Sequence, residues 1–300
     1  MTQLDLDPEL DLELVRDLKA PRALLWACWT DPKHLVHWFV PKPHKVVAVE
    51  QDLRPGGAAN MTFDVGGTLM ENPGVYLEVI PGEKLVFTDT YSVGWKPAAE
   101  PFMTAIVTFE DREPGITRYR AVVRHRSKDA AENHRKMGFF DGWSTVAGQL
   151  ETYAQELETR QITISRLIKA PPATVLRCWT DPTILPKWFG PEGYSCVTKE
   201  IDLREGGVWR FDMVGHGETW ANRHRYTIMR LERIEFLMDA DADGEPMYVD
   251  ISLTPEAGGT RLTQTITLPS AEAKTGALGY GADEKGLQTL AKLAAIAEKL

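Results

Sequence analysis

Cysteine is scarce in this sequence, whose 300 residues contain only Cys28, Cys178 and Cys196. Three thiols cannot all pair with one another, and no two of them stand in a C-x-x-C arrangement. The sequence therefore predicts neither a disulfide framework nor a zinc knuckle. We expect the three thiols to be reduced and buried.

Basic side chains are also in deficit, because 34 lysines and arginines face 43 aspartates and glutamates, for a formal net charge of −9. A surface that binds nucleic acid or an anionic membrane usually has a basic excess, so neither is an expected partner. No stretch approaches the roughly 18 consecutive apolar residues of a membrane-spanning helix. The acidic N-terminus MTQLDLDPELDLEL does not resemble a secretory signal. We expect a soluble, cytoplasmic protein without membrane insertion.

Internal similarity, in contrast, is plentiful. The stretch ACWTDPKHLVHWF at residues 27–39 has a counterpart, RCWTDPTILPKWF, 150 positions later at residues 177–189. The same interval separates DLRPGG from DLREGG further along the chain. Solenoid repeats are about 20–50 residues long, so a unit near 150 residues is a whole domain. We predict two copies of one domain, residues 1–158 and residues 159–300.

Each copy shows the same order of patterns. Alternating apolar residues predict an opening strand, and Asp31-Pro32 and Asp181-Pro182 predict the end of one short helix and the start of another. Period-two stretches between glycine-rich turns predict an antiparallel sheet. Apolar residues at intervals of three and four over 137–157 and 287–297 predict a long final helix. That helix must cover an apolar sheet face, which predicts an α+β fold.

The CWTDP…WF stretches, the DLRxGG turns and a glycine-rich lead into the last helix resemble the SRPBCC, or START-like, superfamily. Within it the chain looks most like the family of homologues of the activator of heat-shock protein 90 ATPase. The resemblance implies two tandem helix-grip (START-like, Bet v 1-like) domains, each a curved antiparallel sheet wrapped around a long C-terminal helix, with a deep apolar cavity between them. Superfamily members bind lipids, sterols, polyketides or other hydrophobic small molecules, and some are cyclases or other enzymes.

Candidate catalytic and metal motifs have simpler structural interpretations. Cys28 lies within a predicted helix, and nothing local lowers the pKa of its thiol. His34 and His37 share one helix face, but neither has a histidine counterpart in the second copy. The glycine-rich 276–281 lacks both the preceding strand and the following Lys-Ser/Thr of a phosphate loop. We therefore predict no catalytic residue, no metal site and no nucleotide or other cofactor.

Aromatic and apolar residues on segments that border the grip are the candidate ligand-binding residues. A cavity for an apolar ligand is lined by the same residue types as a core, with a few polar groups that orient the ligand. His125 is the expected polar group of the first cavity. The candidates are Trp38, Phe63, Tyr76, Phe87, Tyr119, His125, Met137 and Phe140 in the first copy, and Trp188, Trp209, Phe211, Tyr226 and Phe236 in the second.

The two copies differ at positions that should face the cavity. The first has Ala59 and Met61 where the second has Trp209 and Phe211. The first cavity is therefore expected to be roomier. This difference suggests that one copy binds a ligand while the other is more filled and serves as a packing partner.

The function that these patterns favour is non-covalent binding of a hydrophobic, lipid- or polyketide-like small molecule, driven by apolar burial at about 25 cal/mol per Å². Two alternatives stay open. The first is a co-chaperone-like regulator of an ATPase, which would have a chaperone or another protein as its partner. The second is a cyclase or hydrolase acting in the cavity. An enzyme would need at least two polar groups converging in one cavity, whereas a carrier needs fewer.

Overall fold

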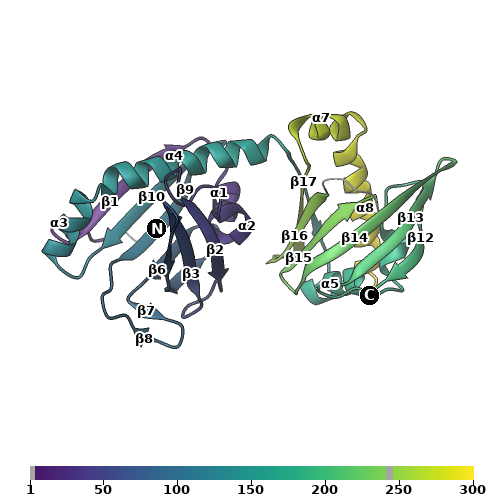
Figure 1. The fold of residues 1–300 in the computed structure, drawn as a ribbon. Coiled ribbons are helices and arrows are strands. Elements are labelled where there is room, and N and C mark those ends of the chain that lie inside the picture. Colours follow the sequence, from purple (N-terminus) through teal and green to yellow (C-terminus); the bar gives the residue numbers. More distant parts are fainter. Residues whose placement is uncertain (1–3, 241–245) are drawn as a thin grey trace. The chain divides into compact units, whose positions relative to one another are not determined.

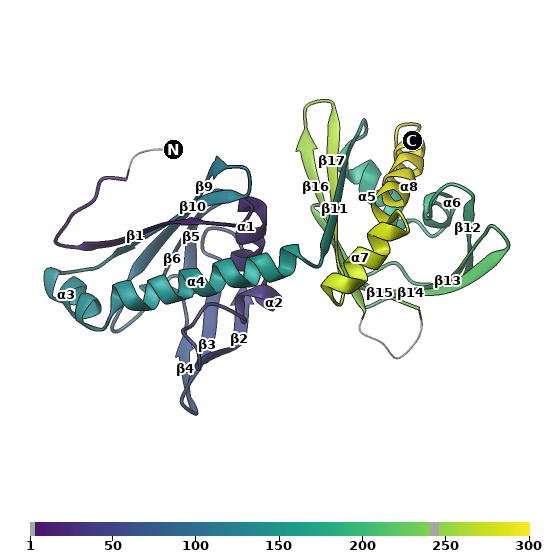
Figure 2. The same cartoon turned by 90° about the horizontal axis from the view of Figure 1, so that it is seen from above.

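The computed structural model describes residues 4–240 and 246–300. The chain divides into two compact units, Met1–Glu158 and Thr159–Leu300, and each combines an antiparallel sheet with helices (Figures 1 and 2). Among the described residues no helix combines the length and apolar character needed to cross a membrane.

The first unit contains ten strands and four helices in the described residues. In chain order these are β1 (Asp11–Leu18), α1 (Arg22–Thr30), α2 (Pro32–Leu35), β2 (Lys45–Gln51), β3 (Ala59–Val65), β4 (Thr68–Asn72), β5 (Val75–Ile80), β6 (Lys84–Thr88), β7 (Tyr91–Ser92), β8 (Lys96–Pro97), β9 (Thr104–Glu113), β10 (Ile116–Arg124), α3 (Lys128–Lys136) and α4 (Phe139–Glu158).

The second unit repeats this order with a single strand in place of β4 and β5, and its described residues contain no counterpart of the small β7–β8 hairpin. Its elements are β11 (Gln161–Ile168), α5 (Pro172–Thr180), α6 (Leu185–Trp188), β12 (Tyr194–Ile201), β13 (Val208–Gly215), β14 (Glu218–Met229), β15 (Arg233–Asp239), β16 (Met247–Glu256), β17 (Gly259–Thr267), α7 (Ala271–Gly279) and α8 (Ala282–Ala297). The seven strands that the structure describes in this unit form one sheet in the order β11-β17-β16-β15-β14-β13-β12.

Both units are helix-grip domains, as the sequence predicts. In the first, α4 contacts β1 and α1, and in the second α8 contacts β11 and α5 (Figure 2). The buried side chains of α4 and α8 follow the expected intervals of three and four residues. They are Phe139, Ala147, Leu150, Ala154 and Leu157 on α4, and Leu290, Leu293, Ala294 and Ala297 on α8.

The repeated CWTDP…WF stretch has an architectural role in both units. Its second tryptophan donates an indole hydrogen bond back to the carbonyl of its cysteine, from Trp38 to Cys28 over 3.1 Å and from Trp188 to Cys178 over 3.0 Å. Asp31 ends α1 and caps the N-terminus of α2. These bonds fix the chain between the first helices and the sheet, because a buried indole N–H needs an acceptor.

The sheets of the two domains differ at one interruption. In the first domain the strands form a five-stranded sheet, β1-β10-β9-β6-β5, and a separate three-stranded sheet, β2-β3-β4. Pro73 and Gly74 lie between β4 and β5, where the second domain has the continuous strand β14. Proline removes a ladder hydrogen bond, and a Cβ on Gly74 would lie 2.7 Å from the carbonyl oxygen of Thr88. An isolated bridge, from Ala58 to Val75, lies between the two parts.

Candidate functional site

The interior of the first domain is built around the indole of Trp29, which α1 places against the sheet. Its ring centroid lies 5.0 Å from that of Trp38, 6.0 Å from that of Phe87 and 6.2 Å from that of Tyr119. Phe39 meets it edge-on at 5.5 Å. The domain therefore presents a nearly continuous aromatic wall between its sheet and its helices.

Most of the ligand-binding candidates of the first domain lie in or beside this wall. Trp38, Tyr76 and Tyr119 are buried, and Phe63 and Phe87 are partly buried against the same core. Burial of these side chains fits a hydrophobic core as well as a ligand-binding cavity. The polar groups of the interior therefore decide whether the domain is suited to a ligand.

Gln51, at the end of β2, brings such a polar group into the aromatic interior. Its Nε2 donates to the carbonyl oxygen of Trp29 over 3.1 Å and to the hydroxyl of Tyr76 over 2.7 Å. A carbonyl oxygen can only accept, so the amide nitrogen must face Trp29 and Oε1 must point away from it. Gln51 Oε1 and Trp29 Nε1 are both buried without a hydrogen-bond partner among the described residues. The site thus offers one unused acceptor and one unused donor.

Sequence reasoning did not find Gln51. Its counterpart 150 positions later is Ile201, so the available signal was a polar residue in one copy that replaces an apolar residue in the other. The position of the side chain follows only from the structure, where Gln51 turns inward and donates to the hydroxyl of Tyr76.

The interior of the second domain is filled by larger side chains. Trp209 and Phe211 are buried and their rings stack at 3.9 Å. His224 pairs with Trp209 across β13 and β14 and stacks on Phe236 at 4.4 Å. The first domain has Ala59, Met61 and Gly74 at the positions of Trp209, Phe211 and His224. The side chains that face inward at these positions are therefore much smaller in the first domain.

His224 is the second functional candidate that sequence reasoning missed. The side chain is fully buried, and both ring nitrogens lack a hydrogen-bond partner among the described residues. Burial lowers the pKa of His224 to about 3, although the charge of Asp239 acts to raise it. The imidazole is therefore neutral at physiological pH. Its counterpart in the first copy is Gly74, so the available signal was again a residue that differs between the two copies.

His125, the expected polar group of the first cavity, is hydrogen-bonded to other parts of the domain. It lies directly after β10, where its Nδ1 is 2.9 Å from the carbonyl oxygen of Leu10 and its Nε2 is 2.9 Å from Nδ1 of His134. Both ring nitrogens are thus occupied. Burial, followed by the charge of His125, lowers the pKa of His134 to about 4. These partners come from other elements, the segment before β1 and helix α3.

Met137 and Phe140 are also placed differently from the prediction. Their side chains are 74% and 45% exposed, so neither borders the interior. Gly138, with φ of +94°, separates α3 from α4, whereas the predicted pattern ran through this point as one helix. Phe139 is the residue that α4 turns toward the sheet, and it is buried.

The remaining candidates, all in the second domain, are buried in its core. Trp188, Trp209, Phe211, Tyr226 and Phe236 each expose at most 2% of their surface. Like His224, Tyr226 has a polar atom, its hydroxyl oxygen, without a partner among the described residues. Trp179 Nε1 shares this property, as does its counterpart Trp29 in the first domain.

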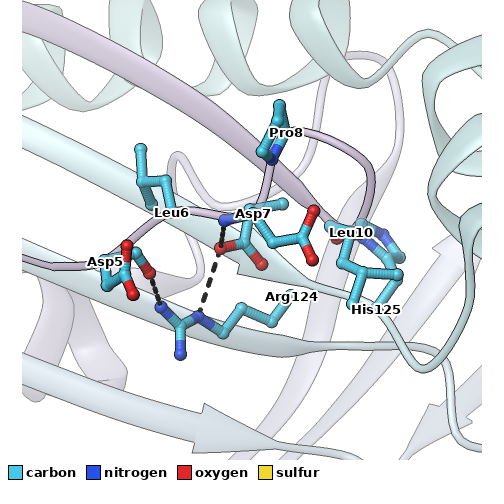
Figure 3. A pocket seen from close by; sticks show the side chains of 8 residues that line it. Asp5, Leu6, Asp7, Pro8, Leu10, Arg124 and His125 are labelled. Atoms are coloured by element: carbon cyan, nitrogen blue, oxygen red, sulfur yellow. Dashed lines mark hydrogen bonds and ion pairs between the residues drawn. The ribbon is translucent and has the colours of Figure 1, made fainter.

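Two surface pockets of the first domain lie outside this interior. One, of about 430 Å³, is bordered by the segment before β1 together with Arg124 and His125; Arg124 there donates to the carbonyl oxygen of Asp5 over 2.7 Å (Figure 3). The other, of about 590 Å³, lies beside the start of α1 and the β9–β10 turn. His125 is the one ligand-binding candidate that borders either of these two pockets.

The comparison with protein families decides the identity of the fold. The model for "Activator of Hsp90 ATPase homolog 1-like protein" matches residues 19–155 and again residues 169–298. The chain belongs to this family. The resemblance read from the CWTDP and DLRxGG motifs is thereby confirmed, and each domain carries one copy of the family's unit.

The solved structures to which this chain is similar match either one half of it or nearly all of it. A Nitrosomonas europaea protein is 36% identical over 51% of this chain and 99% of its own, with a TM-score of 0.49. The di-domain ARO/CYC BexL from the BE-7585A biosynthetic pathway is 13% identical over 96% of this chain and 98% of its own, with a TM-score of 0.40. The di-domain ARO/CYC StfQ from the steffimycin biosynthetic pathway is 14% identical over the same shares, with a TM-score of 0.44. No curated protein matches the chain.

Proposed function

We propose that the first domain binds a hydrophobic small molecule non-covalently between its sheet and its long helix. The observation that carries this proposal is the pair of unused polar atoms, Gln51 Oε1 and Trp29 Nε1, buried in an aromatic interior. Buried polar atoms in proteins are nearly always paired, and leaving one unpaired costs about 1–3 kcal/mol. A ligand that carries a matching donor and acceptor removes this cost.

The apolar and polar groups of this site would have the separate roles that they have in a carrier protein. Apolar contact with the aromatic wall would supply most of the affinity, at about 25 cal/mol per Å² of area removed from water. The Gln51 amide and the Trp29 indole would fix the orientation of the ligand, because each forms a directional hydrogen bond. Lipid- or polyketide-like molecules with an apolar frame and a few oxygen atoms fit these requirements.

Native mass spectrometry of the protein purified from its source tests the proposal directly. We expect a co-purifying small molecule that is released on denaturation. An interior that is empty in the purified protein and takes up nothing from a metabolite extract would contradict the proposal. Stimulation of a purified chaperone ATPase by such an empty protein would then favour the regulatory alternative.

Two variants connect the ligand with the first domain. Gln51→Ile introduces the residue of the second copy and should weaken binding about fivefold or more, the equivalent of one hydrogen bond. Met61→Phe introduces the bulk of Phe211 and should block binding. Val47→Thr is the matched control, since Val47 lies on the same strand as Gln51 and is 49% exposed. Equal affinity in all three variants would place the ligand elsewhere.

A further inference from the structure

Three aliphatic side chains form a row on the outer face of the first domain's sheet, opposite the helices. Val86 on β6 lies beside Ile106 on β9, which lies beside Val122 on β10. Ala121 and Val123, the neighbours of Val122 along β10, belong to the core under the helices, and successive side chains of a strand point to opposite faces. Val86, Ile106 and Val122 therefore form a separate apolar cluster, which we call the outer row.

The second domain has polar residues in the equivalent row. Thr265 and Val122 are each the seventh residue of a nine-residue strand, β17 and β10. Thr265 lies beside Asp250 on β16, which lies beside Glu235 on β15. One face of an antiparallel sheet is commonly polar and solvated, so the shared fold does not require an apolar row at this place.

The chain's own residues 4–10 cover the outer row, and we call this segment the arm. Leu4 and Leu6 pack against the row, whereas Asp5 and Asp7 are exposed. Side chains that alternate in this way are typical of an extended segment with one side on an apolar surface. The outer row thus contacts a peptide-like segment through every second side chain.

Basic side chains next to the outer row bind the arm. Arg124, at the end of β10, donates to the carbonyl oxygen of Asp5 over 2.7 Å (Figure 3). Lys128, at the start of α3, lies 2.6 Å from a carboxylate oxygen of Glu9. The surface beside the row is therefore suited to a segment whose exposed residues are acidic, because opposite charges attract.

The arm fills this surface incompletely. Among the described residues, the bond from Arg124 is the one hydrogen bond that joins residues 4–6 to the sheet. A pocket of about 430 Å³ remains between the arm and the end of β10. Arg124 Nε is buried without a hydrogen-bond partner in the part of the chain that the structure describes, 3.5 Å from a carboxylate oxygen of Asp11. Buried donors nearly always have a partner, so the surface has capacity for an occupant larger than the arm.

We infer that the outer row binds an extended segment of a partner protein in which leucine alternates with aspartate or glutamate, and that the arm is a weaker internal substitute for this segment. Leucines at every second position would contact the row as Leu4 and Leu6 do. The acidic residues would pair with Arg124 and Lys128, and a longer segment would fill the pocket. This inference goes beyond the small-molecule binding proposed above, because it concerns the opposite face of the sheet.

The arm would then be an autoinhibitory contact. Because it is tethered to the domain, it binds the row as an intramolecular ligand at high effective concentration. A partner segment binds only the fraction of molecules in which the row is free, and its apparent affinity falls in proportion to that fraction. An arm in place in nine of ten molecules would weaken partner binding about tenfold.

The test uses a fluorescein-labelled eight-residue peptide in which leucine and aspartate alternate, and fluorescence polarisation measures its binding to the full chain. The arm variant, Leu4→Ser with Leu6→Ser, loses the apolar contacts of the arm and should bind the peptide about tenfold more tightly than the wild type. Leu231→Ser is the matched control, since Leu231 is 48% exposed in the second domain, and it should bind as the wild type does. Equal binding by wild type and arm variant, or no binding by either, would overturn the inference.

Two substitutions in the arm variant assign the binding to the outer row. Val122→Thr introduces the residue of the second copy, and Arg124→Gln removes the cation; each should weaken peptide binding about fivefold. Unchanged affinity in both would place the peptide elsewhere and contradict the inference. A peptide in which leucine and lysine alternate should not bind, and equal affinity for it would mean non-specific apolar adsorption. Dimers formed by the arm variant and not by the wild type, measured by analytical ultracentrifugation, would assign the row to a second copy of the chain instead.

Discussion

Acidification from pH 7 to pH 5 should destabilise the second domain through His224. The native imidazole is fully buried, and its pKa is lowered to about 3, whereas histidine in an unfolded chain titrates near 6.5. The unfolded state therefore takes up a proton first as the pH falls. The stabilisation is fully present above about pH 6.5 and is lost progressively below it.

The size of the effect follows from proton uptake by the unfolded chain. At pH 5 this uptake stabilises the unfolded state by about 2 kcal/mol, compared with about 0.2 kcal/mol at pH 7. His224→Phe removes the titrating group. The free energy of unfolding of the wild type should therefore fall on acidification from pH 7 to pH 5 by about 2 kcal/mol more than that of the variant.

Urea titrations of the full chain at both pH values, followed through amide NMR signals of β13 and β14, measure this difference in the second domain alone. Tyr226→Phe is the control at the same site. Burial raises the pKa of Tyr226, so its hydroxyl stays protonated and the substitution should have the same effect at both pH values. Parallel pH dependences for wild type and His224→Phe would refute the reasoning, because they would mean that protons reach His224 in the native state.

Three further predictions concern the first domain. Gly57→Ala should lower the free energy of unfolding by roughly 2 kcal/mol or more, because the added Cβ would lie 2.1 Å from the carbonyl oxygen of Asp52; an unchanged thermal midpoint would contradict this. Ser127→Ala should lower the free energy of unfolding by about 1 kcal/mol, because the serine side chain accepts from the backbone N–H of Ala130 over 3.2 Å at the start of α3. Thermal unfolding measures this loss, and equal stability of variant and wild type would contradict the capping role. Burial raises the pKa of the Cys28 thiol to about 12, so iodoacetamide at pH 8 should modify it only after unfolding, and mass spectrometry that finds rapid native labelling would disprove the assignment.

The architecture could be predicted because its signals are local. The spacing of Cys28 and Trp38, repeated 150 positions later, marks the same hydrogen bond in both domains. Asp31 before a proline predicts a helix end and a cap, and both are present. The prediction of one continuous helix from residue 137 was wrong although a local signal was present. Gly138 separates α3 from α4, and the apolar spacing alone does not show this break.

The sequence by itself determined the duplication, the fold class and the inward faces of helices and strands, since these depend on neighbours along the chain. Only the tertiary structure decided which buried polar groups have hydrogen-bond partners. Both ring nitrogens of His125 have partners because Leu10 and His134 fold onto it, while the ring nitrogens of His224 have none among the described residues and lie between aromatic rings from other segments. The physical reason is that a hydrogen bond depends on where distant segments meet, and a single sequence does not record that distance.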